Sequence, residues 1–296
     1  MSMSRVSRRG LLAVAVLTVI GGGAVEAGVI LRQPGEGEAP AAAAPTLSPT
    51  PTPTPDHLAA ARAKAAAYVA ELGNGQLTVA VRDRRSDLSL TVGSTRFPTA
   101  SIVKVDILAA LLLRDGEITD TDRRNAERMI TESDNAAATA LFRRIGGKAG
   151  LASANRTFGM KQTTANSAWG KTTTTAADQI RLLSSITDEE GPLDEDRRSY
   201  LFDLMRQVDE NQDWGVPAAA GPRATEVYVK NGWDNISADG GRWQVNTIGR
   251  IVEPGHDWLV AVLSHGHQTQ TAGIRMIEAA ARYTLGELRK IPTQPT

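Results

Sequence analysis

The sequence predicts an α/β (α+β) protein: an antiparallel sheet of about five strands, flanked by N- and C-terminal helices, with an inserted all-helical lobe. Two strand-like segments near the start of the chain and three near its end are separated by a long run of helix-like segments. Neighbouring strand segments are joined by short links, which favours antiparallel pairing. The helical run between the two groups of strands favours an inserted lobe.

The first elements follow from local patterns. An Ala-rich helix is expected from residue 57 to about Leu72, with Asp56 as its N-cap. Alternating apolar residues at 76–83 indicate a half-buried strand. Residues 88–93 indicate the return strand of a hairpin.

Six helices are expected next, the second of them capped by Thr119 or Asp120, and the Gly146-Gly147 pair ends the third. Their ranges are 101–114, 119–133, 135–147, 150–160, 174–187 and 194–208. Three strands rich in Val, Ile and Trp follow at 225–232, 242–252 and 257–266, and an amphipathic helix closes the chain at 271–290.

Composition limits the functional classes. Hydrophobic residues make up 41% and charged residues 22% of the 296 residues, enough for one sizeable core or two small ones. Lys+Arg and Asp+Glu both total 33, so no basic field recommends a nucleic-acid partner. The absence of cysteine excludes disulfides, thiolate zinc sites, a cysteine nucleophile and a lipid-modified cysteine within these residues.

Residues 1–31 have the layout of an export signal: an arginine-rich start, an apolar run and then small residues. The run Ser7-Arg8-Arg9-Gly10-Leu11-Leu12 resembles a twin-arginine signal, although an ordinary secretory signal with a chance arginine pair has the same layout. Val25-Glu26-Ala27 is a candidate cleavage site. Uncleaved, the segment would be a short anchor, because its apolar run is below the ~20 residues of a spanning helix.

Residues 32–56 form a Pro/Thr-rich linker. Seven of the fourteen prolines lie at 34–55, and proline favours polyproline II over helix and sheet. Such a semi-rigid spacer suits a domain held away from a membrane or within a cell wall; a solubilising linker without that duty is the alternative. We expect residues 57–296 to form one domain.

Ser101 and Lys104 lie three residues apart at the start of a predicted helix, so their side chains share one face. A serine hydroxyl is a weak nucleophile unless a base accepts its proton. Lysine can be that base if burial or a neighbouring cation lowers its pKa. This spacing alone recurs by chance in most chains of such length, so other residues have to decide.

Two further triplets follow in order. Ser133-Asp134-Asn135 lies where two predicted helices meet, and Lys230-Asn231-Gly232 ends a predicted strand. Together with Ser101-x-x-Lys104, this order over residues 57–296 resembles the serine β-lactamase and penicillin-binding superfamily, and most closely its class A β-lactamase-like serine hydrolases. The resemblance implies the β-lactamase/transpeptidase-like fold and an active-site serine.

The resemblance also implies roles. The catalytic candidates are Ser101 as the nucleophile, Lys104 as its base and Ser133 as the proton relay to the leaving nitrogen. The substrate-binding candidates are Asn135, Lys230, Asn231, Gly232 and Trp233. The charge of Lys230 would serve the substrate carboxylate and lower the pKa of Lys104. The backbone N–H groups of Ser101 and Trp233 would form the oxyanion hole.

Three features depart from the class A pattern. Residues 136–177 contain no Asp or Glu, so the loop that carries the deacylation glutamate in those enzymes has none here. Only 31 residues separate Ser101 from Ser133, a much shorter gap than usual. Asn231 replaces a hydroxyl residue, and Trp233 places a large ring beside the oxyanion hole, where it could bind a ligand or pack a sheet edge with Trp243.

We therefore expect an exported bacterial serine hydrolase, extracellular or associated with the cell wall. A β-lactam or a peptidoglycan stem peptide would acylate Ser101, and slow deacylation would make β-lactamase turnover doubtful. Two alternatives stay open: a true β-lactamase with a non-standard deacylation base, and a non-catalytic cell-wall ligand-binding or sensor module that kept the fold. We expect a monomer without cofactor or metal, with membrane contact only through an uncleaved leader.

Overall fold

The structure is a computed structural model that describes residues 55–73, 76–86 and 88–292. The expected export signal, its cleavage site and nearly all of the linker lie outside the described residues. In the ranges that are described, no helix is both long and apolar enough to cross a membrane.

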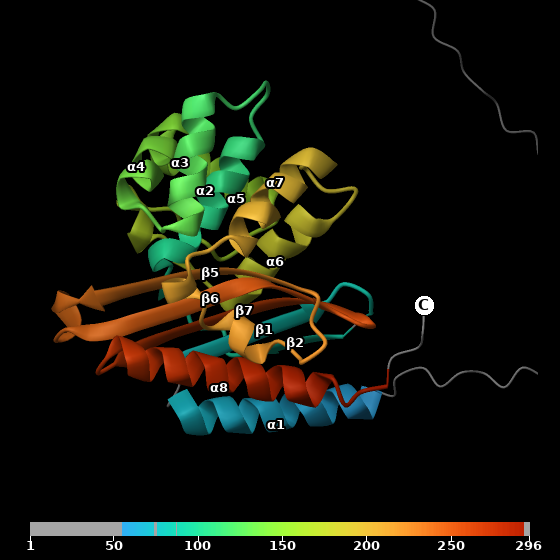
Figure 1. The fold of residues 1–296 in the computed structure, drawn as a ribbon. Helices are drawn as coiled ribbons and strands as arrows, with labels where there is room; N and C mark the ends of the chain where they lie inside the picture. The colour runs from blue at the N-terminus through green and yellow to red at the C-terminus, as the bar shows by residue number, and fades with distance from the viewer. Residues whose placement is uncertain (1–54, 74–75, 87, 293–296) are drawn as a thin grey trace, which may run out of the picture. The chain divides into compact units, whose positions relative to one another are not determined.

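A five-stranded antiparallel sheet forms the centre of the fold, as the sequence predicted (Figure 1). Its spatial order is β2 (Ser89–Val92), β1 (Leu77–Asp83), β7 (His256–His267), β6 (Arg242–Glu253) and β5 (Glu226–Ile236). The last strands are longer than expected, because the β5–β6 hairpin stays in register out to the pair Ile236 and Arg242. The N-terminal hairpin therefore lies at one edge of the sheet and β5 at the other.

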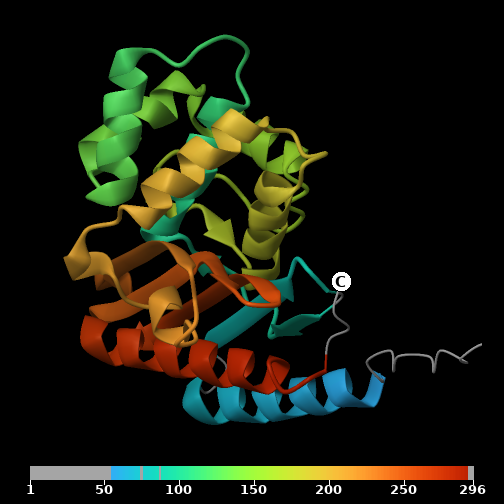
Figure 2. The ribbon, with the colours of Figure 1, turned by 45° about the vertical axis from the view of Figure 1, so that its right-hand side comes forward.

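Two long helices, α1 (Pro55–Gly73) and α8 (Gln270–Leu288), cover one face of the sheet (Figures 1 and 2). Their contact includes the stacked rings of Tyr68 and Tyr283, whose centroids are 4.0 Å apart. Buried side chains from alternate positions of the strands, such as Val79 on β1, pack against them. The first and last helices of the chain thus close the same layer.

The helical lobe lies against the opposite face of the sheet (Figure 2). Its helices are α2 (Val103–Leu112), α3 (Asp120–Thr131), α4 (Asn135–Arg144), α5 (Gly147–Thr157), α6 (Ala176–Thr187) and α7 (Glu195–Arg206). Every residue of α2 is buried, so this helix is the core of the lobe. Thr119 caps α3 through a capping box with Asp122, which resolves the choice between Thr119 and Asp120.

Three local features differ from the expectation. Strand β1 is buried on both faces except at Arg82, because helices cover both sides of the sheet, so it is not half-buried. The helix expected to begin at Ser101 opens with a separate 3₁₀ turn, Ala100–Ile102, before α2 starts. A two-residue ladder between β3 (Phe97–Pro98) and β4 (Thr173–Thr174) was not predicted, since two residues carry no periodicity.

Candidate active site

Ser101 lies on the 3₁₀ turn between the sheet and α2, and its backbone is held from both sides. Ala100, the residue before it, has a φ of 46°, a conformation that costs free energy for a residue with a side chain. Asn246 on β6 stabilises this turn, since its Nδ2 donates to the carbonyl oxygens of Pro98 and Thr99 at 3.0 and 3.1 Å. Asn246 was not among the sequence-based candidates.

Lys104 is completely buried on α2, and its ammonium group lies among four oxygen atoms. Its Nζ is 3.0 Å from Ser101 Oγ, 3.0 Å from Ser133 Oγ, 2.6 Å from the Ser133 carbonyl and 2.8 Å from Asn135 Oδ1. Burial lowers the pKa of Lys104 to about 8, and the nearby carboxylate of Asp134 opposes part of that shift. A lysine with this pKa is partly neutral near pH 7 and can accept a proton.

Ser133 sits at the junction of α3 and α4 in a left-handed conformation, with a φ of 59°. Asp134 follows as the N-cap of α4, where its carboxylate accepts the Ala137 N–H, and this hydrogen bond holds the Asp134 pKa below its usual value. The junction aims the Ser133 hydroxyl and the Asn135 amide at Lys104.

Lys230 reaches the same place from β5. It is completely buried, and its Nζ donates to Ser133 Oγ at 3.1 Å. Burial and the nearby charge of Lys104 hold the pKa of Lys230 well below its usual value. The Ser133 hydroxyl therefore lies between two lysines of lowered pKa, an arrangement in which it can pass a proton.

Gly232 lets β5 approach the serine turn closely. A Cβ at this position would lie 2.7 Å from the backbone nitrogens of Ser101 and Ile102 and 2.8 Å from the Thr99 carbonyl oxygen, which is too close for any larger residue. The strand thus lies directly against the backbone N–H of Ser101, where the sequence placed one half of the oxyanion hole.

The side chains of Asn231 and Trp233 lie on the other face of β5 from Ser101, so the expected contact of the Asn231 amide with a substrate carboxylate was wrong. Side chains alternate along a strand, so if Lys230 and Gly232 face Ser101, residues 231 and 233 face the other side. The buried Asn231 donates its amide to the carbonyl oxygens of Gln212 and Trp214, at 2.7 and 2.9 Å.

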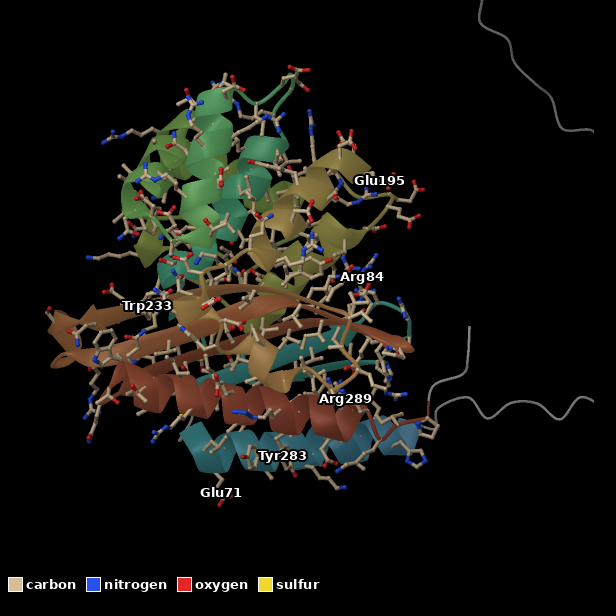
Figure 3. All side chains as sticks on the ribbon, viewed as in Figure 1. Glu71, Arg84, Glu195, Trp233, Tyr283 and Arg289 are labelled. Atoms are coloured by element: carbon tan, nitrogen blue, oxygen red, sulfur yellow. The ribbon has the colours of Figure 1, made fainter. Side chains whose placement is uncertain are left out.

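The ring of Trp233 packs on the ring of Trp214, with centroids 5.6 Å apart, and lies near the end of the sheet (Figure 3). It therefore packs a sheet edge, and Trp214, Trp233 and Trp243 are all half-buried against the same core cluster. The backbone N–H of Trp233 remains the candidate for the second half of the oxyanion hole.

Trp169 is a site residue that sequence reasoning missed. The half-buried ring lies over Lys104 Nζ, 5.1 Å from the ring centroid, and its Nε1 donates to Thr139 Oγ1 at 3.2 Å. It comes from the acid-free loop 159–175, whose first residues are held by the carboxylate of Asp178. An aromatic wall thus stands beside the lysine on the loop that was expected to lack a base.

The side chains of Arg250 and Glu132 take no part in the hydrogen bonds of the serine site. Arg250 makes a bidentate ion pair with Asp257 and stacks on Phe202 and Tyr228, outside the serine site. Glu132, next to Ser133 in sequence, is exposed. Across the described ranges, no three His, Asp or Glu side chains cluster closely enough to hold a metal ion.

Comparison with protein families identifies the chain. A profile of the β-lactamase enzyme family matches residues 119–288, which is more than half of the sequence. The chain belongs to the β-lactamase enzyme family. The matched range contains Ser133 and Lys230 but begins after Ser101 and Lys104, so the place of those two in a β-lactamase-like site rests on the geometry described above.

Solved structures of β-lactamase-like proteins share the fold. A variant of PBP-A, as its acyl-enzyme complex with penicillin G, superposes with a TM-score of 0.65 at 24% identity, over 77% of this chain and 97% of that one. The class A β-lactamase of Mycobacterium abscessus gives 0.62 at 22% identity, over 77% and 99%. At these identities the likeness establishes the fold and leaves activity to be argued.

A curated relative of this β-lactamase-family chain is LppW of Mycobacterium tuberculosis, which is named as a lipoprotein. It is 28% identical over 201 residues, covering 64% of this chain. The chain spans about 62% of the length of that relative.

Proposed function

We propose that this protein is an active-site serine hydrolase whose Ser101 is acylated by β-lactams or by peptidoglycan-type amides. One observation carries the proposal: Lys104 Nζ, with a pKa lowered to about 8 by burial, lies 3.0 Å from Ser101 Oγ. A buried amine in hydrogen-bond contact with a serine hydroxyl is the arrangement that activates such a nucleophile.

The acylation step uses the site as follows. Ser101 Oγ forms a bond to the carbonyl carbon of the substrate, and its proton passes to neutral Lys104 Nζ. The carbonyl oxygen becomes an oxyanion, which the backbone N–H groups of Ser101 and Trp233 stabilise. Ser133 Oγ gives its proton to the leaving nitrogen and regains one from Lys104, and the C–N bond breaks to leave an ester on Ser101.

Two residues are placed to bind the rest of the substrate. The exposed Asn135 bonds Lys104 through Oδ1, which leaves its amide N–H₂ for an amide carbonyl of the substrate. Lys230 Nζ lies next to Ser133 Oγ, where it can donate to a substrate carboxylate, and the negative charge of that carboxylate would favour the protonated lysine. A molecule with an amide side chain and a carboxylate near the scissile bond, such as a penicillin or a stem peptide, fits this pair.

We further propose that the ester on Ser101 is hydrolysed slowly. Hydrolysis needs a base that activates water, and residues 136–177 contain no carboxylate. The group that the loop 159–175 places over Lys104 is the ring of Trp169. Neutral Lys104 is the group best placed to replace such a base, and its four neighbouring oxygens leave it little freedom to reach a water molecule.

A non-catalytic binding module is the less supported candidate. Such a module has no need for a lysine in hydrogen-bond contact with a serine, or for the strained backbones at Ala100 and Ser133 that hold the two groups in place.

The similarity to LppW, which is named as a lipoprotein, supports a location outside the cytoplasm, where peptidoglycan is found.

Intact-mass measurement after incubation with penicillin G tests the proposal. We expect the mass to increase by that of one penicillin, the adduct to map to Ser101, and the increase to last for many minutes. The Ser101→Ala variant should remain unmodified, whereas Ser167→Ala, an exposed serine of the nearby loop, should react normally. No adduct and no hydrolysis would refute the catalytic proposal, and fast hydrolysis without an adduct would refute slow clearance.

A further inference from the structure

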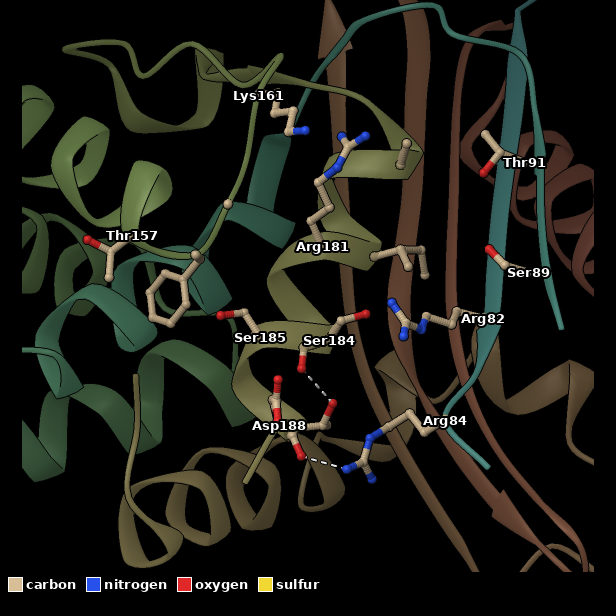
Figure 4. A pocket seen from close by; sticks show the side chains of 15 residues that line it. Arg82, Arg84, Ser89, Thr91, Thr157, Lys161, Arg181, Ser184, Ser185 and Asp188 are labelled. Atoms are coloured by element: carbon tan, nitrogen blue, oxygen red, sulfur yellow. Dashed lines mark hydrogen bonds between the residues drawn. The ribbon is translucent and has the colours of Figure 1, made fainter. Parts of the chain in front are cut away.

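A separate cavity lies between the N-terminal hairpin and α6 (Figure 4). Its volume is about 710 Å³, and it is lined by none of the serine-site residues. We call this cavity the β1–α6 groove, and its polar lining includes five side chains that could contact a ligand: Arg82, Ser89, Thr91, Lys161 and Arg181.

The groove exists because the helical lobe leaves one end of the sheet uncovered. On the lobe-facing side of β1, Ala80 is buried whereas Arg82 is exposed. Ser89 and Thr91 of the edge strand β2 pair with Arg82 and Ala80, so they lie on the same face, and both are exposed. The floor of the groove is therefore a polar strip of sheet with a cation at its end.

The walls add more positive charge. Arg181 comes from α6 and Lys161 from the start of the loop that carries Trp169 (Figure 4). Arg181 is paired with Asp178. Within the described residues Arg82 and Lys161 have no ion-pair partner, and Asp188, which is exposed, is the one acid on the lining.

We propose that the β1–α6 groove binds a phosphate-bearing anion that carries more than one phosphate group. A guanidinium group can donate two hydrogen bonds to one phosphate group in a bidentate pair, and an ammonium group adds a further positive charge. The exposed hydroxyl groups of Ser89 and Thr91 complete the set of donors. Arg82 lies on the floor of the groove and Lys161 on the facing wall. A single small anion would contact one of these two cations, whereas an anion with two linked phosphate groups could contact both.

Calorimetric titration of the full chain with inorganic pyrophosphate tests the proposal. We expect saturable binding that weakens as salt rises, and a loss of affinity of at least tenfold in the Arg82→Ala, Lys161→Ala double variant. The matched control is Arg62→Ala, Arg275→Ala, which removes the same charge from exposed positions of α1 and α8 on the other side of the sheet. Thermal melting of all three proteins checks that they fold.

Two results would overturn the proposal: no saturable binding, or an equal loss of affinity in the control variant. Vesicles distinguish the sources of the phosphate. Sedimentation with vesicles of cardiolipin, a lipid that carries two phosphate groups, but not with phosphatidylcholine vesicles, abolished by the groove variant, would assign a lipid headgroup. Pyrophosphate binding without sedimentation would assign a soluble or polymeric phosphate. The serine-site proposal is independent of either result.

Discussion

Raising the pH from 6 to 8 should accelerate the acylation of Ser101 roughly 50-fold, because only neutral Lys104 can accept the serine proton. With a pKa of about 8, Lys104 is neutral in about 1% of molecules at pH 6 and in about half of them at pH 8. The sign follows from the chemistry: burial lowers the lysine pKa, so the active neutral form gains population as pH rises and saturates above pH 8.

A single charge should shift this profile. The carboxylate of Asp134 raises the pKa of Lys104 against the effect of burial. Asp134→Asn removes the charge, and the new side chain keeps an oxygen that can cap α4 by accepting the Ala137 N–H. The midpoint of the acylation profile should therefore move to lower pH, and the variant should react faster than the parent at pH 6.

The chain supplies a matched control in Asp194, the N-cap of α7, whose carboxylate accepts the Arg197 N–H at 2.9 Å. Asp194→Asn makes the same change at a helix that carries no site residue. The assay is the pseudo-first-order rate of fluorescent-penicillin labelling between pH 5.5 and 9. A flat profile, or an Asp134→Asn midpoint that rises or matches that of Asp194→Asn, would refute the assignment of Lys104 as the base.

Three further changes test other parts of the structure. Burial raises the pKa of Asp106 on α2 to about 8. The free energy of unfolding should therefore fall as pH rises from about 4 to 8, by up to ~1.4 kcal/mol per pH unit. In urea unfolding Asp106→Asn should flatten this decline, and an equal decline in the variant would contradict the buried, protonated Asp106. Gly232→Ala should slow labelling of Ser101 by ~10² or more, because the new Cβ would collide with the backbone of the serine turn. Gly286→Ala, where a Cβ meets open space, should not change the labelling rate. Equal rates in the two variants would exclude the close approach of β5 to Ser101. Trp169→Ala should shorten the lifetime of the acyl-enzyme in time-resolved mass measurements, whereas Trp169→Phe, which keeps a ring over Lys104, should not. Equal lifetimes in all three proteins would show that the ring does not slow deacylation.

The helices and strands could be predicted because most of them carry their own signals. Thr119 and Asp122 cap α3 through contacts within four residues of sequence. The three-residue spacing of Ser101 and Lys104 already predicted that their side chains meet. Ser133 lies between two segments that each carry a helical pattern. Information of this kind is local, so the sequence contains it.

What could not be predicted depends on contacts between distant segments. Trp169 stands over Lys104 because its loop is held by Asp178 at one point and by Thr139 at another. The residues around position 169 show no sequence pattern that predicts this course of the loop. The error at Asn231 was different in kind, since strand alternation with Lys230 already implied that the two side chains face opposite ways.

The geometry of the serine site supports the proposal that Ser101 is acylated faster than its ester is hydrolysed. Ala100 and Ser133 are the two non-glycine residues of the described chain with positive φ, and each such backbone costs on the order of 1–3 kcal/mol. Hydrogen bonds stabilise these two strained backbones. The Asn246 amide donates to the turn before Ser101, and the Lys104 ammonium group donates to the Ser133 carbonyl oxygen. Lys104 is therefore both the proposed base and a structural tie. A contact that positions a nucleophile in advance accelerates the first attack, but it does not supply the second base that would direct water at the ester. The loop that places the ring of Trp169 over Lys104 has no carboxylate that could act as this base.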